Sequence, residues 1–162
     1  MTENTHQPAE STFEKRLWGR FSGVLRWADL DSLWGRILAD PAGWYLYVVG
    51  QEAPGETIAP PDLDARLREI DRILRDKHKH DYCGIVYVDE PASPGMVKIY
   101  DPENLGVVCG PGGERILPRW ILSREKPRAL DEYGAGKAEK DTSLFGSNAW
   151  WRRIYALKKP GA

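Results

Sequence analysis

The stretch YCGIVYVDEPASPGMVKIYDPENLGVVCG, residues 82–110, decides the fold, because β-branched and aromatic runs alternate in it with turn signals. Residues 83–89 predict one strand and residues 96–100 a second, with two prolines in the loop between them. A third predicted strand covers residues 106–109, after the turn DPEN at residues 101–104. These signals together predict an antiparallel meander.

Two further strands are predicted outside this stretch. The run WYLYVV at residues 44–49 is too short and too apolar for a surface helix, so it indicates a central strand. Residues 120–123 predict the last strand. Residues 51–61 contain three prolines and a glycine and therefore predict a loop.

Three helices are predicted before the meander. Ser11 and Glu14 have the spacing of a capping box ahead of a short helix, which Ser22 and Gly23 interrupt. Asp29 is a good N-cap for a second helix. A third helix is expected from Asp62, and its apolar stripe is Leu63, Leu67, Ile70 and Leu74.

The order of these elements predicts an α+β fold: a largely antiparallel sheet of four to five strands, with two to three helices packed on one face. We expect a disordered N-terminus at residues 1–12 and a single domain at residues 13–124. A Gly-, Lys- and Glu-rich flexible linker is expected at residues 125–148, followed by an amphipathic basic-aromatic tail at residues 149–162.

Composition excludes several functions. The 162 residues carry a formal charge of -1, so no basic field is present to hold a nucleic acid, and we expect no nucleic-acid partner. The N-terminus has polar residues where a secretory signal needs apolar ones, and no window approaches about 18 consecutive apolar residues. We therefore expect a cytoplasmic protein whose two cysteines are reduced thiols.

The cysteines do not form an obvious site. In a meander, Cys83 opens the first strand and Cys109 closes the third, which separates them beyond the roughly 7 Å limit for a disulfide. The same geometry argues against a shared metal, and no Cys-x-x-Cys or His-Glu-x-x-His spacing is present. We expect no metal and no cofactor.

A weaker hypothesis places catalysis at Cys83, with His80 or His78 as the base that a nucleophilic thiol needs. A thiolate is favoured at a helix N-terminus, however, and Cys83 follows the C-terminal end of the third predicted helix, whose dipole opposes negative charge.

The tail combines cations with aromatic residues and contains no acid between residues 150 and 159. It has three interpretations: docking into a groove of a partner protein, contact with an anionic membrane surface, or folding back on its own domain. The candidate interaction residues are Trp150, Trp151, Arg152, Arg153, Ile154 and Tyr155.

Seven short segments share a recognisable pattern: WGR at residues 18–20, WADL at 27–30, YCGIVYVD at 82–89, KIYDP at 98–102, NLG at 104–106, CG at 109–110 and WILS at 120–123. Together they resemble a family of small uncharacterised bacterial proteins. The resemblance implies a bacterial, single-domain protein, and it supplies no activity, ligand or catalytic residue.

The sequence thus favours a non-catalytic protein-interaction or accessory module. Its expected contact elements are the aromatic edge of the sheet and the tail. Two alternatives stay open: a small cysteine-dependent enzyme using Cys83, and a protein that attaches to a membrane surface through its tail.

Overall fold

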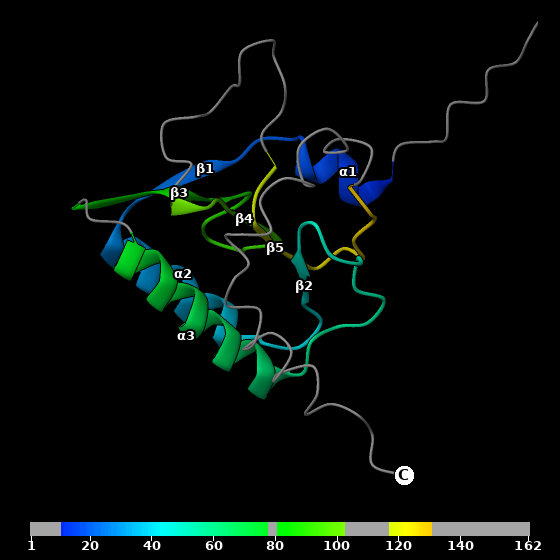
Figure 1. The fold of residues 1–162 in the computed structure, drawn as a ribbon, viewed down its shortest axis with the longest axis horizontal. Coiled ribbons are helices and arrows are strands. Elements are labelled where there is room, and N and C mark those ends of the chain that lie inside the picture. Colours follow the sequence, from blue (N-terminus) through cyan, green and yellow to red (C-terminus); the bar gives the residue numbers. More distant parts are fainter. Residues whose placement is uncertain (1–10, 78–80, 103–116, 131–162) are drawn as a thin grey trace, which may run out of the picture.

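A computed structural model describes residues 11–77, 81–102 and 117–130 of the chain. In these ranges a five-stranded antiparallel sheet has the strand order β1-β3-β4-β5-β2 (Figure 1). The strands are β1 (Ser22–Arg26), β2 (Tyr45–Val48), β3 (Tyr82–Val88), β4 (Met96–Ile99) and β5 (Trp120–Ser123). The helices are α1 (Thr12–Leu17), α2 (Trp27–Ala39) and α3 (Pro60–Lys77). The predicted α+β class is confirmed.

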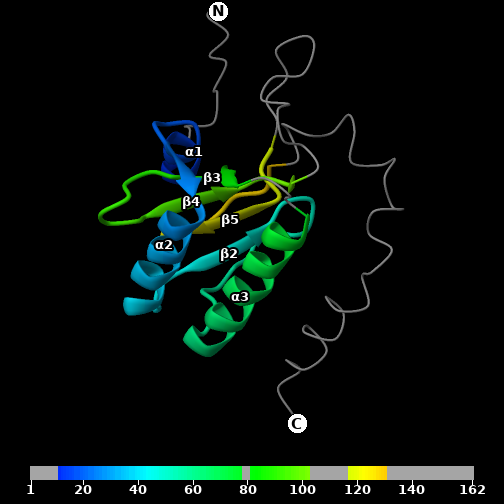
Figure 2. The same cartoon turned by 90° about the vertical axis from the view of Figure 1, so that its left-hand side faces the viewer.

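The two long helices form one layer against one face of the sheet (Figure 2). Helix α3 buries Leu63, Leu67, Ile70 and Leu74, which are the four residues of the predicted stripe. Helix α2 contributes Leu30, Leu33, Trp34 and Ile37 to the same apolar cluster, called the main core below. On the sheet side the main core includes Val86, Val97 and Leu122.

The opposite face of the sheet is also covered, here by α1 (Figure 2). Its apolar residues alternate along the strands with those of the main core, as the two-residue period of a strand requires. They form a second core of Phe13, Leu17, Tyr47, Met96, Ile121 and Leu130. Helix α1 begins with the predicted capping box, in which the Glu14 amide donates to Ser11 Oγ at 3.2 Å and the Ser11 amide donates to Glu14 Oε2 at 3.0 Å.

The structure corrects two expectations about the strands. Ser22 and Gly23, expected only to interrupt a helix, begin β1, which pairs with β3. Strand β2, expected to be central, is the other edge of the sheet. Tyr47 and Val48 are both buried because both sheet faces are covered, Tyr47 in the second core and Val48 in the main core. This explains why an edge strand can resemble an apolar central one.

The meander is confirmed for its first two strands, β3 and β4. The predicted strand at residues 106–109 lies outside the described residues, and β4 pairs directly with β5. Packing continues past residue 124: Leu130 is only 2% exposed, and its amide donates to the hydroxyl of Tyr47 at 3.3 Å.

Candidate functional site

The two edges of the sheet differ in how they are covered. Beside β2, the Ile58 amide donates to Trp44 O at 2.8 Å and the Gln51 amide donates to Val48 O at 3.1 Å, so the following segment lies along this edge. Ile58 and Ala53 also pack on the main core and the second core, respectively. Across the described ranges, β1 has no comparable cover, and its strand hydrogen bonds go to β3.

The uncovered edge presents apolar side chains. Leu25 on β1 is 63% exposed and Tyr82 at the start of β3 is 49% exposed. All other large apolar residues in the described part of the chain are buried or half-buried. Both lie at the same end of the β1–β3 pair, so their exposure is concentrated at one place.

A local irregularity in the pairing of β1 with β3 lies next to Leu25 and Tyr82. Val24 pairs with Val86 and Arg26 pairs with Tyr82, so β3 contains more residues than β1 over this interval. Gly84 lies in this bulge with a φ of 72°, and a Cβ built there would lie 3.1 Å from a Tyr82 ring carbon. The Tyr82 ring therefore lies against the glycine backbone.

The charges next to this edge neutralise each other. Arg26 Nε donates to Asp29 Oδ2 at 2.9 Å, where β1 leads directly into α2. The hydrogen bond from Arg26 lowers the pKa of Asp29, and the same contact raises the pKa of Arg26. The exposed edge is therefore apolar at Leu25, and the Arg26–Asp29 ion pair lies next to it.

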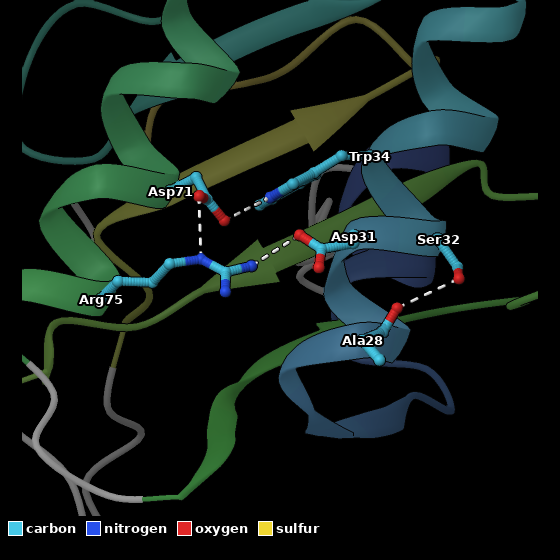
Figure 3. A network of polar contacts seen from close by, with 6 residues as sticks. All are labelled: Ala28, Asp31, Ser32, Trp34, Asp71 and Arg75. Atoms are coloured by element: carbon cyan, nitrogen blue, oxygen red, sulfur yellow. Dashed lines mark hydrogen bonds and ion pairs between the residues drawn. The ribbon is translucent and has the colours of Figure 1, made fainter.

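A polar network joins α2 to α3 (Figure 3). Asp71 accepts hydrogen bonds from Trp34 Nε1 at 3.0 Å and Arg75 Nε at 2.9 Å. Arg75 also donates to Asp31 at 2.6 Å and lies 4.9 Å from the ring centroid of Trp27. The carboxylates are thus occupied by side-chain donors, and the network fixes the two helices against each other.

The candidate nucleophile Cys83 has no exposed surface and belongs to the main core. Burial raises the pKa of its thiol, and backbone hydrogen bonds from Ile85 and Val86 offset only part of that effect. A nucleophilic cysteine needs the opposite, a stabilised thiolate. His78 and His80 lie outside the described residues, as does Cys109.

The predicted interaction residues of the tail, from Trp150 to Tyr155, also lie outside the described ranges. Within those ranges, no group of three or more His, Cys, Asp or Glu side chains could hold a metal ion. None of the described helices is long and apolar enough to cross a membrane.

Sequence reasoning missed one half-buried cation on the α1 side of the sheet. Lys98 shares its strand face with Met96, and a sheet covered on one side only would expose that face to water. Because α1 and the turn after it cover it, burial lowers the pKa of Lys98 to about 8. The two-residue period of residues 96–100 indicated which side chains share this face of the sheet. It did not indicate that α1 covers the face.

Comparison of the chain with protein-family models, curated proteins and solved structures finds no significant match. The geometry of the described residues therefore carries the functional argument, and the resemblance to a bacterial family stays a prediction.

Proposed function

We propose that the protein is a non-catalytic interaction module that binds an extended segment of a partner protein along β1. The observation that carries this proposal is Leu25, which is 63% exposed on an edge strand that no described segment covers. An extended peptide can add to such an edge by backbone hydrogen bonds, while pockets and exposed side chains provide selectivity.

The composition of β1 supports this mode of binding. Edge strands that must not pair usually carry proline, an inward-pointing charge or several exposed lysines. Strand β1 has the sequence SGVLR, with Val24 buried beneath it and a single cation, Arg26, which pairs with Asp29. Its central three residues therefore include no proline, charge or lysine, and the irregularity in its pairing with β3 follows Val24.

The strand is also held in place before a partner arrives. Four pairs of residues join β1 to β3, and α2 begins at the residue after Arg26. A rigid edge loses little conformational entropy on binding, so more of the contact energy remains as affinity. The proposal also includes the tail residues Trp150 and Trp151, which would make a second contact with the partner, separate from the contact along β1.

Short random peptides displayed on phage test the proposal, with the full-length chain as bait. Leu25→Lys places a charge on the exposed edge, and Thr57→Lys is the matched control, because Thr57 is exposed beside the covered β2 edge. Burying a leucine side chain contributes roughly 1.5–3 kcal/mol, and 1.4 kcal/mol is tenfold in affinity. Leu25→Lys should therefore weaken the selected peptides about tenfold to a hundredfold, while Thr57→Lys should leave them unchanged.

Two results would reject the β1 site. Selected peptides could bind the Leu25→Lys protein as tightly as the unaltered one, or they could lose affinity only when Trp150 and Trp151 are both changed to alanine. Light scattering tests whether β1 instead pairs with a second copy of this chain. A dimer that Leu25→Lys converts to a monomer would show that the occupant of the edge is that second copy and not a partner protein.

A further inference from the structure

Gly23 is the second residue of β1 and is paired with Tyr87 of β3. A Cβ built on Gly23 would lie 3.4 Å from Cε1 and 3.8 Å from Cδ1 of that tyrosine, so the Tyr87 ring lies over the glycine backbone. Gly23 is exposed and Tyr87 is half-buried. At this position, therefore, β1 places no side chain between the tyrosine ring and the open edge of the sheet.

Gly23 lies on the α1 side of the sheet. Val24, the next residue along β1, belongs to the main core on the other side, and side chains alternate along a strand. Leu25, which is 63% exposed, therefore shares the face of Gly23. Phe21, two residues before the glycine, packs on the second core on this same side. The α1 side of the edge thus presents two apolar side chains with a gap between them.

The backbone polar groups of Gly23 point away from β3. In β3 and just after it, the residues two positions before and after Tyr87 bond toward β4: Ile85 O accepts from the Tyr100 amide at 2.9 Å, and the Asp89 amide donates to Met96 O at 3.1 Å. The direction of hydrogen bonding alternates along an antiparallel strand, so Tyr87 also bonds toward β4. Its cross-strand partner Gly23 therefore has both its N–H and its C=O directed to the open edge.

We propose that the partner segment runs antiparallel to β1 and places an aromatic side chain opposite Gly23. This inference rests on the proposed function, because it specifies what the β1 site selects. An antiparallel strand continues the pairing of the described sheet. The residue of the partner opposite Gly23, called position X below, would exchange two backbone hydrogen bonds with the glycine.

The gap over Gly23 accounts for the aromatic preference. The side chain at position X would lie on the same face as Gly23, with the Tyr87 ring on the other side of the gap. An aromatic ring opposite an edge glycine covers the backbone that the glycine leaves exposed. Tyr87 already packs edge to face against Tyr100, with 5.6 Å between the ring centroids, so a third ring would extend an existing aromatic pair.

A double-mutant cycle between Gly23→Ala and alanine at position X tests the inference, with peptides selected on the full-length protein. Gly23→Ala keeps both backbone groups, and its methyl group fits at ordinary van der Waals distance from the Tyr87 ring, so the fold should be retained. The methyl group would separate the ring at position X from Tyr87. The preference for an aromatic residue over alanine at position X should therefore fall by about threefold to tenfold.

Gly55→Ala is the matched control. Gly55 belongs to the segment that lies along the β2 edge, and no atom lies within 4 Å of the position that an alanine Cβ would take. This substitution should leave the preference at position X unchanged.

Methylation of the peptide backbone tests the register separately. The amide of position X would donate to Gly23 O, so an N-methyl group there should weaken binding by about tenfold or more. The amides of the two residues that flank position X would point away from β1. Methylation of either flanking amide should change the affinity by less than about threefold.

The outcomes separate this inference from the proposed function. Peptides that lose affinity for the Leu25→Lys protein, but have no position coupled to Gly23→Ala, would overturn the inference and leave the proposed function standing. Coupling of Gly23→Ala to a polar or charged position of the peptide would overturn it in the same way. Peptides that bind the Leu25→Lys protein without loss would reject both the β1 site and the inference.

Discussion

At the scale of single residues, Gly84 has the most specific conformational requirement near the proposed edge. Its φ of 72° lies in the left-handed region, which residues other than glycine adopt only at a cost in free energy. The Tyr82 ring also occupies the space where a Cβ would lie. This glycine therefore accommodates both the backbone conformation in the bulge of β3 and the close approach of the Tyr82 ring.

Gly84→Ala should lower the free energy of unfolding by about 1–2 kcal/mol, from the left-handed conformation together with displacement of the Tyr82 ring. Gly35→Ala is the matched control. Gly35 lies inside α2, and no atom lies within 4 Å of the position that an alanine Cβ would take, so alanine should raise stability there by about 0.5–1 kcal/mol. Chemical denaturation of the two variants measures both changes. Equal effects of the two substitutions would show that the conformation of Gly84 imposes no special constraint.

At the scale of elements, apolar helix stripes were predicted more accurately from the sequence than strand positions. The predicted N-cap Asp29 was wrong, because α2 begins at Trp27 with Arg26 as its N-cap, and Asp29 lies in the first turn. The stripe from Leu63 to Leu74 and the Ser11 capping box are both present, because each depends on neighbours within about one turn. Strand β1 was missed because its five residues expose all but Val24, which leaves little apolar pattern to detect. Whether a strand is central or at an edge depends on distant pairing, so the position of β2 was also predicted wrongly.

For the candidate site, too, features that depend on contacts distant in the sequence were the ones that could not be predicted. A surface role for aromatic residues at the margin of the sheet was predicted, and Tyr82 lies there. Leu25 was not singled out, because an exposed leucine becomes informative only when its strand is known to be an edge. Lys98 was missed for a related reason: its enclosure comes from α1, far away in the sequence.

The network between α2 and α3 gives a prediction at this scale. Asp71 accepts from Trp34 Nε1 and Arg75 Nε in a partly buried position. Asp71→Ala should cost about 1–3 kcal/mol of stability because Trp34 Nε1 loses its acceptor, while Arg75 keeps its bond to Asp31. Asp64→Ala on the same helix removes only the exposed pair with Arg68 and should cost less than about 1 kcal/mol. Thermal unfolding of both variants tests this ranking, and a larger loss for Asp64→Ala would contradict it.

At the scale of the whole molecule, the sheet is covered on both faces and along one edge. The main core and α2 with α3 occupy one face, and the second core with α1 occupies the other. The segment after β2 lies along the β2 edge. Within the described residues, β1 is therefore the place where the sheet can still be extended.

Hydrogen exchange of the full-length protein, with and without a saturating library-selected peptide, tests this account most directly. An added strand would bond the β1 backbone groups that do not bond β3, so exchange across Ser22–Arg26 should slow at least tenfold on binding. Exchange across residues 51–58, beside β2, should not change. Protection elsewhere in the chain, with exchange in β1 unchanged, would contradict the central claim.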